Sequence, residues 1–149
     1  VWILETNLDD VSGELIGHTT GLLMAAGALD VYTTAIQMKK NRPAVTMSVI
    51  CGVDEVQGLE SIIFRETGTL GIRRWPVNRR ILKRRSLQVH TPWGPVAGKL
   101  ATTPDGQERF SPEYEACCRV ALAHDLPLAE VYEAAHRAWT SGQLAGDPN

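Results

Sequence analysis

The sequence has few cysteines and no spaced motif of soft metal ligands. Its three cysteines, Cys51, Cys117 and Cys118, form no CxxC pair, and its four histidines form no HxxxH pair. Zinc sites need such spacing, so a zinc site is not predicted. An odd number of cysteines without a framework is typical of a reducing compartment, and we therefore expect a cytoplasmic protein.

Long apolar runs and common catalytic motifs are also missing. No apolar run approaches the ~20 residues that a membrane-spanning helix needs, so no membrane association is expected. The chain contains neither the GxxxxGK(S/T) pattern of a P-loop nor the GxSxG pattern of a serine hydrolase. The first residue is Val1 rather than Met, which predicts that the 149 residues are a piece of a longer chain.

The charges are distributed unevenly along a chain whose net charge is only −2. Eleven of the 15 basic residues lie between Lys39 and Arg85, and no acid occurs from Thr67 to Pro104. The last 45 residues reverse this balance, with eight acids and three bases. A basic centre in a slightly acidic chain indicates a localised anionic ligand rather than general affinity for nucleic acid.

Apolar spacing predicts a chain of alternating strands and helices. Strands are expected at residues 2–8, 30–38, 44–51 and 72–82, with a helix between the first two and another between the last two. A hairpin at 86–91 and 95–102 should follow, and then helices at 112–124 and 127–139, the first of them starting at Pro112.

This order predicts the α+β class. The first six elements, β-α-β-β-α-β, match a ferredoxin-like βαββαβ core, to which a β-hairpin and two C-terminal helices are added. We expect one nucleotide-binding domain over residues 1–140 and a disordered tail over residues 141–149.

Acidic side chains gather where the first strand ends, in Glu5-Thr6-Asn7-Leu8-Asp9-Asp10. In a strand, Glu5, Asn7 and Asp9 share one face, with Asp10 just beyond. Clustered carboxylates suit a hard divalent cation, which prefers oxygen ligands, so Asp9, Asp10 and Glu5 are candidate metal ligands. The alternative is that Asp9 or Asp10 caps the following helix and Glu5 is solvated.

A basic turn, Lys39-Lys40-Asn41-Arg42-Pro43, separates the second and third strands. Lysine supplies a mobile point charge, and arginine supplies a planar fork that can hold a phosphate at two points. Asn41 can both donate and accept hydrogen bonds. The turn is therefore a candidate phosphate site, and the alternative is an ordinary solvated hairpin turn.

A glycine- and threonine-rich segment, Glu66-Thr67-Gly68-Thr69-Leu70-Gly71-Ile72-Arg73-Arg74, follows the second helix. Its backbone N–H groups and the hydroxyls of Thr67 and Thr69 can contact a phosphate, with Arg73 beside them. The alternative is a helix C-cap followed by a tight turn.

Beyond this segment, basic residues continue to Arg85, with Arg80 among them and Lys99 on the following hairpin. Alternate members of such a stripe can line one site, and the others would be solvated or meet another subunit. Nucleic-acid binding is the rival interpretation, but no aromatic-rich stacking surface accompanies the stripe. We expect a homo-oligomer, because seven like charges in one short segment need anions nearby and an open sheet leaves edges to be covered.

Together, four ordered blocks resemble the C-terminal part of a known family. They are Glu5 to Asp10, Gly27-Ala28-Leu29-Asp30-Val31, Met38 to Pro43 and Glu66 to Arg73, and Pro112-Glu113-Tyr114-Glu115 also fits. The family is that of the pyridinium-3,5-bisthiocarboxylic acid mononucleotide nickel insertases, which act in lactate racemase cofactor synthesis. The resemblance runs from about residue 2 to residue 139.

The resemblance implies CTP and Mg²⁺ or Mn²⁺ as cofactors, Ni²⁺ as the substrate metal, a pyridinium mononucleotide as substrate and a larger N-terminal domain of the same protein as partner. The expected nucleotide-binding residues are Lys39, Lys40, Asn41, Arg42, Thr67, Thr69, Arg73, Arg80 and Lys99. The expected cation ligands are Asp9, Asp10 and Glu5, and no catalytic residue is assigned. The alternative function is a regulatory or oligomerisation module that binds a nucleotide without turnover, and nucleic acid is not an expected partner.

Overall fold

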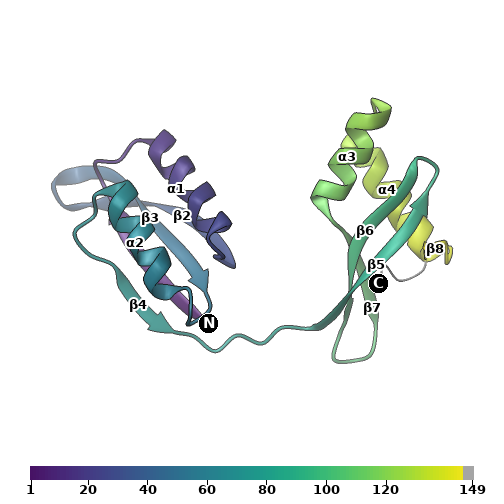
Figure 1. Ribbon diagram of the computed structural model, residues 1–149, viewed down its shortest axis with the longest axis horizontal. Coiled ribbons are helices and arrows are strands. Elements are labelled where there is room, and N and C mark those ends of the chain that lie inside the picture. The colour runs from purple at the N-terminus through teal and green to yellow at the C-terminus, as the bar shows by residue number, and fades with distance from the viewer. Residues whose placement is uncertain (146–149) are drawn as a thin grey trace. The chain divides into compact units, whose positions relative to one another are not determined.

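The computed structural model describes residues 1–145. The chain forms two compact units, one ending at Arg79 and the other beginning at Arg80 (Figure 1). Each unit contains a four-stranded sheet and two helices. The predicted α+β class is therefore confirmed. Whereas the sequence predicted one domain over residues 1–140, each of the two units has its own hydrophobic core.

The first unit follows the predicted order of elements, and its sheet has the strand order β2-β3-β1-β4 with every neighbouring pair antiparallel. The elements are β1 (Trp2–Leu8), α1 (Gly13–Ala25), β2 (Asp30–Met38), the 3₁₀ turn η1 (Lys39–Asn41), β3 (Arg42–Cys51), α2 (Val56–Thr67) and β4 (Arg73–Pro76).

Alternation along β1 separates the two faces of this sheet. Leu4 and Leu8 are buried in the core, while Glu5 and Asn7 between them are only partly buried. The core also contains Leu23 of α1 and other apolar residues of β3 and α2, namely Met47, Val49, Cys51, Leu59 and Ile63. Both helices therefore pack on the Leu4 face (Figure 1), and the Glu5 face carries no helix of this unit.

Local signals set the ends of α1. The Ser12 hydroxyl accepts a hydrogen bond from the Leu15 N–H at 3.3 Å and caps the helix start. Gly27 follows the last turn with φ +96°, a left-handed conformation that glycine adopts without steric cost. The helix and the strand β2 after it consequently begin and end close to where the sequence placed them.

The second unit is a sheet of order β7-β6-β5-β8 with two helices packed on it. Its elements are β5 (Lys83–Thr91), β6 (Gly94–Thr102), β7 (Glu108–Pro112), α3 (Tyr114–His124), α4 (Leu128–Thr140) and β8 (Leu144–Ala145). The core joins the buried strand residues Leu87, Val89, Val96 and Phe110 to the inner sides of the helices. The opposite face of this sheet carries no helix from the described part of its own unit, residues 80–145 (Figure 1).

Three sequence predictions differ from the structure. The strand expected at 72–82 is only β4, which ends at Pro76; Val77 still exchanges hydrogen bonds with Val1, and residues 78–82 have no strand partner in the described part of the chain. The helix expected to start at Pro112 starts at Tyr114, since Pro112 is instead the last residue of the unpredicted strand β7. Of the tail expected to be disordered over 141–149, Leu144–Ala145 pairs with β5, and residues 146–149 lie outside the described part.

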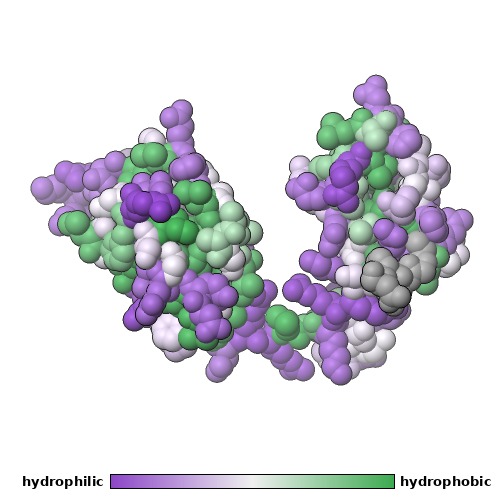
Figure 2. Space-filling view, in the orientation of Figure 1, coloured by the Kyte–Doolittle hydropathy of each residue, from purple (hydrophilic) through white to green (hydrophobic). Residues whose placement is uncertain are grey.

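Exposed apolar residues lie over the helices of both units, where Figure 2 shows hydrophobic surface. They include Leu15, Met24 and Phe64 in the first unit and Tyr114 and Leu122 in the second. Within residues 1–145, no helix combines the length and the apolar character needed to cross a membrane.

Candidate functional site

The open face of the first sheet carries a row of polar side chains across all four strands. The register places Tyr32 beside Ser48, Ser48 beside Glu5, and Glu5 beside Arg73. The Ser48 hydroxyl donates a hydrogen bond to Glu5 Oε1 at 3.0 Å, and Arg73 Nη2 lies 3.5 Å from Glu5 Oε2. Glu5 is thus held from both sides by neighbouring strands.

A second row, Thr34, Thr46 and Asn7, lies next to the first. Asn7 Oδ1 accepts two hydrogen bonds, from Thr46 Oγ1 at 3.0 Å and from Arg73 Nη2 at 2.7 Å. Arg73 therefore bridges the two rows. Its side chain remains 55% exposed, so the ion pair with Glu5 contributes at most about 1 kcal/mol to stability and leaves Arg73 accessible to a ligand.

A second ion pair lies where β1 ends and β3 begins. Arg42 Nη1 donates to Asp9 Oδ2 at 3.0 Å, and the Arg42 side chain is 54% exposed. Asp10 is exposed and makes no ion pair within the described residues. The acidic pair predicted from the sequence is therefore divided: Asp9 holds an arginine, and Asp10 faces solvent.

The predicted basic turn closes the hairpin between β2 and β3. Met38 pairs with Arg42, so the three residues Lys39, Lys40 and Asn41 form the loop. Lys40 and Asn41 have φ of 62° and 57°, a left-handed conformation that is uncommon for residues other than glycine. All three residues are exposed, and neither lysine makes an ion pair in residues 1–145. Two lysines without ion pairs in that range therefore lie two and three residues before Arg42.

The glycine–threonine segment is fastened to β1 by its own hydroxyls. Thr6 Oγ1 is buried, donates to the Gly71 carbonyl at 2.9 Å and shares a 2.7 Å hydrogen bond with Thr69 Oγ1. Thr67 Oγ1 donates to the Ile63 carbonyl at 2.7 Å, and Gly68 ends α2 in the left-handed conformation with φ 64°. These bonds fix the segment just before Arg73, and a phosphate contact from Thr67 or Thr69 stays a prediction.

The remaining predicted residues, Arg80 and Lys99, belong to the second unit. Arg80 is its exposed first residue, and Lys99 lies on β6 with its Nζ 3.8 Å from Glu113 Oε1. The structure thus brings Glu5, Asp9, Arg42 and Arg73 onto or beside one sheet face. The basic turn continues that group at the β2–β3 end.

The hydroxyl partners on this face were not predicted from the sequence. Ser48 is only 2% exposed, and neither it nor Thr46 stood out in the sequence. Their hydrogen bonds to Glu5 and Asn7 depend on the β1–β3 register, which pairs residues about 40 positions apart. Alternation in β3 placed Met47 and Val49 on one face. The polar residues at the alternating positions, Thr46 and Ser48, were therefore the available signal for side chains on the opposite face.

The carboxylates fit a hard cation in chemistry but not as a complete ligand set. In the part of the chain that the structure describes, no group of three His, Cys, Asp or Glu side chains is arranged to hold a metal ion. Glu5 and Asp9 each contact an arginine instead. A divalent cation here would therefore need oxygen atoms from a bound ligand as well as from the protein.

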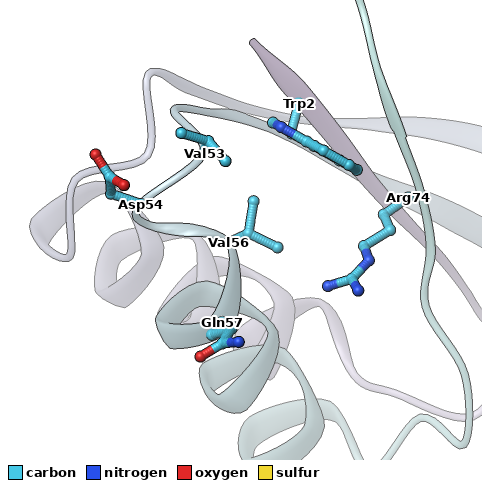
Figure 3. Close-up of a pocket in the computed structure, with 6 residues that line it drawn as sticks. All are labelled: Trp2, Val53, Asp54, Val56, Gln57 and Arg74. Atoms are coloured by element: carbon cyan, nitrogen blue, oxygen red, sulfur yellow. The ribbon is translucent and has the colours of Figure 1, made fainter.

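The opposite side of the same sheet has a separate pocket of about 240 Å³, drawn in Figure 3. Trp2 and Arg74, from adjacent strands, face Val56 and Gln57 of α2 across it (Figure 3). Arg74 Nη1 contacts both carboxylate oxygens of Glu60 at 3.2 Å. Arg73 and Arg74 are thus neighbours in sequence that serve opposite faces, and no predicted site residue lines this pocket.

Comparison with known proteins gives a consistent result. A family model described as nickel insertion protein matches residues 1–132. A putative nickel insertion protein of Cyanothece sp. is 43% identical over 141 residues, covering 95% of this chain and 34% of the relative. The pyridinium-3,5-bisthiocarboxylic acid mononucleotide nickel insertion protein of Alkaliphilus metalliredigens is 40% identical, covering 95% of this chain and 33% of the relative. The chain spans about a third of the length of the curated relatives it matches.

Two solved structures share the fold. The apo form of LarC2, described as the C-terminal domain of a cyclometallase involved in the synthesis of the NPN cofactor of lactate racemase, is 41% identical with a TM-score of 0.86. The alignment covers 93% of this chain and 96% of LarC2. A protein of Methanopyrus kandleri has a TM-score of 0.65 at 24% identity, covering 94% of this chain and 86% of its own, and shows the fold alone.

Proposed function

Because this chain belongs to the nickel insertion protein family, we propose that it supplies the nucleotide- and cation-binding part of a longer nickel insertase. The substrate would be the pyridinium bisthiocarboxylic acid mononucleotide named in its relative, and Ni²⁺ would be the metal that is inserted. The larger partner region is supported by the relatives, which are about three times as long as this chain. CTP is the nucleotide that the family resemblance implies.

The observation that carries this proposal is the cationic end of the open face on the first unit. Lys39 and Lys40 make no ion pair in the described residues. Arg42 is held by Asp9 alone and Arg73 by Glu5 and Asn7, and both arginine side chains remain about half exposed. Four cations of this kind suit a triphosphate, which needs several charge-assisted hydrogen bonds. Lysine and arginine on this face would bind and orient the phosphates.

Phosphate binding to these arginines would also release the carboxylates that serve as cation ligands. When phosphates occupy Arg42 and Arg73, the carboxylates of Asp9 and Glu5 lose their arginine partners and become available beside Asp10. Asp9 and Asp10 would hold Mg²⁺ or Mn²⁺ together with phosphate oxygens. Glu5 lies four strand residues, about 13 Å, from Asp9, so it would act on the same ion only through the bound phosphates. When bound, the cation would polarise the phosphates and neutralise their charge.

Three variants test the nucleotide site against a matched control. Lys40→Ala, Arg42→Ala and Arg73→Ala should each weaken CTP binding in calorimetry by about 1–3 kcal/mol, the value of a charge-assisted contact. Arg74→Ala is the control, because Arg74 lies on the opposite face and contacts Glu60. Unchanged affinity in the three variants, or an equal loss in the control, would place the nucleotide elsewhere.

The cation ligands need a separate measurement. Asp10→Asn should lower CTP affinity when Mn²⁺ is present and have little effect in EDTA, because Asp10 makes no ion pair with any residue from 1 to 145 whose loss would disturb the apo protein. An equal loss under both conditions would show that Asp10 has a structural role instead.

A nucleotide-binding module without turnover is the second candidate. It is favoured by the open face itself, which offers cations, carboxylates and hydroxyls but no histidine or cysteine among its paired residues. Nucleotide turnover by the full-length protein distinguishes the candidates: consumption of CTP during nickel insertion supports the enzyme, and binding without consumption supports the module.

We also propose self-association and a cytoplasmic location. Many basic residues between Arg73 and Arg85 are exposed. β2 is an edge strand, and no strand of its own unit pairs with its outer side, so a second copy could pair there. A mass well above 16.3 kDa in light scattering would support self-association, and a mass near that value would refute it. The three cysteines are free thiols, as is typical of a reducing compartment.

A further inference from the structure

The open face of the second unit's sheet carries a cationic arrangement that is centred on the middle strand β6. The register places Arg84 of β5 and Arg109 of β7 on either side of Ala101. In the next row toward the start of β6, Ser86 and Ser111 lie on either side of Lys99. An Arg–Ala–Arg row therefore lies beside a Ser–Lys–Ser row.

These side chains project away from the core of the unit. Leu87, Val89 and Leu100, which alternate with them along β5 and β6, are at most 5% exposed and pack beneath the helices. Arg84, Lys99 and Arg109 are all exposed. Because successive strand residues point to opposite faces, the three cations share the face without helices.

The spacing suits one compact anion. Adjacent strands are about 4.8 Å apart, so Arg84 and Arg109 start roughly 10 Å apart, with only a methyl group between them at Ala101. Long guanidinium side chains can reach a group above Ala101 from both sides, and each can present a planar fork to it. Lys99 enters from the neighbouring row, where two serine hydroxyls offer further donors.

The local charge balance also calls for an anion. Neither Arg84 nor Arg109 makes an ion pair within residues 1–145, and Lys99 has only a 3.8 Å contact with the half-exposed Glu113. The cavity of about 150 Å³ lined by Lys83, Arg85 and Leu100 is separate from this group, because those residues alternate with Arg84 and Ala101 and point to the helix-bearing face.

A nucleic-acid backbone fits this face less well than a single phosphate. The paired positions of the two rows contain no aromatic residue on which bases could stack. The three cations are also grouped about one small residue instead of being spread along a track.

We propose that this face binds the phosphate monoester of a pyridinium mononucleotide, and so forms a substrate-anchoring site distinct from the CTP site on the first unit. The identity of the substrate rests on the proposed function, whereas the recognition of one phosphate group rests on Arg84, Lys99 and Arg109. Arg84 and Arg109 hold the phosphate as opposed forks, and Lys99 adds a third charge.

Nicotinamide mononucleotide is a suitable probe, because it is a pyridinium mononucleotide without the thiocarboxylates. Calorimetry on the 149-residue chain compares it with nicotinamide riboside, which lacks the phosphate, and with inorganic phosphate, which lacks the rest. The variants are Arg84→Gln, Arg109→Gln and the double variant. Arg119→Gln is the matched control, since Arg119 is an exposed arginine on α3 of the same unit.

Nicotinamide mononucleotide should bind at least about tenfold more tightly than nicotinamide riboside or inorganic phosphate. Each single variant should lose on the order of tenfold in affinity, as for one charge-assisted contact, and the control should lose none. Equal binding of the riboside, equal binding of inorganic phosphate, or an equal loss in the Arg119→Gln control would overturn it.

A CTP titration in the presence of Mn²⁺ on the same variants separates this proposal from the proposed function. Unchanged CTP affinity in the double variant supports two distinct sites, and a loss comparable to that for nicotinamide mononucleotide overturns the distinction. If CTP binds but nicotinamide mononucleotide does not, the anchoring site fails alone. If CTP fails to bind while the mononucleotide binds through Arg84 and Arg109, the proposed CTP site fails and the anchoring site stands.

Discussion

Gly98 on β6 has no room for a side chain, and its replacement by alanine gives a sharp test of the second unit. A Cβ built at this position would overlap the Phe110 ring, approaching Cζ to 2.5 Å, and would lie 2.7 Å from the Ser111 carbonyl oxygen. The ring is only 4% exposed, and the oxygen belongs to the backbone of β7. Neither group can move without disturbing the core or the β6–β7 pairing.

We therefore expect Gly98→Ala to lower the free energy of unfolding of the second unit by about 3 kcal/mol, the upper part of the range for overpacked cores. Gly17→Ala is the matched control. Gly17 lies inside α1, has nothing within 4 Å of a new Cβ, and should gain about 1 kcal/mol from the higher helix propensity of alanine.

Urea unfolding followed by tryptophan fluorescence measures both effects. Trp93 and Trp139 report on the second unit, and Trp2 and Trp75 report on the first. Single-tryptophan versions of each variant assign the transition to a unit. A Gly98→Ala midpoint equal to that of the unchanged chain would show that the β6–β7 packing is looser than the structure indicates.

Four further outcomes follow from local contacts. Thr6→Val should lower the free energy of unfolding by about 1 kcal/mol, because the Gly71 carbonyl and the Thr69 hydroxyl lose their partly buried hydrogen bonds to Thr6, and Thr6→Ser should recover most of that in the same urea assay. Burial raises the pKa of the Cys51 and Cys117 thiols, so in native protein an alkylating reagent followed by mass spectrometry should label them more slowly than Cys118. Because the unfolded thiols ionise first, stability should fall as the pH rises through their ordinary pKa, and a flat stability profile there would contradict this. Arg74→Met should change the free energy of unfolding by less than about 1 kcal/mol, since its ion pair is half-exposed; a larger loss would show a greater role in packing.

Much of the first unit was predictable because its signals are local. Alternation in β1, the Ser12 cap and Gly27 each act over a few residues, and the structure places those elements as expected. The division into two units was not predictable in the same way. It depends on which apolar residues pack together, and two separate cores are as compatible with the apolar periodicity as one.

The errors lie where a residue has two structural roles. Pro112 suits the first turn of a helix, but it also suits the end of an edge strand, where no N–H is needed. Pro112 lies in a strand because it pairs with Gly98, 14 residues earlier, and no local sequence pattern indicates that pairing. Phe110 completes the core from that strand, so burial of its ring outweighed the helix signal.

In the candidate site, the residue types were predictable from the sequence but their interaction partners were not. Charge and spacing in the sequence identified Glu5, Asp9, Arg42 and Arg73. Their pairing was not predictable, because Arg73 contacts Glu5 across 68 residues and Arg42 contacts Asp9 across 33. Their binding roles stay predictions, and the structure adds which contacts a ligand would have to replace.

The Arg73 bridge to Glu5 and Asn7 makes anion binding on this face a competition. An incoming oxyanion does not meet a bare guanidinium; it meets one already solvated by two tethered oxygen acceptors. Glu5 and Asn7 compete with the anion for the Arg73 guanidinium, and because they are held in place they act at an effective concentration on the order of millimolar or above. Any anion held there is therefore bound less tightly than by an unoccupied arginine, and its departure is assisted by acceptors that are ready to take its place.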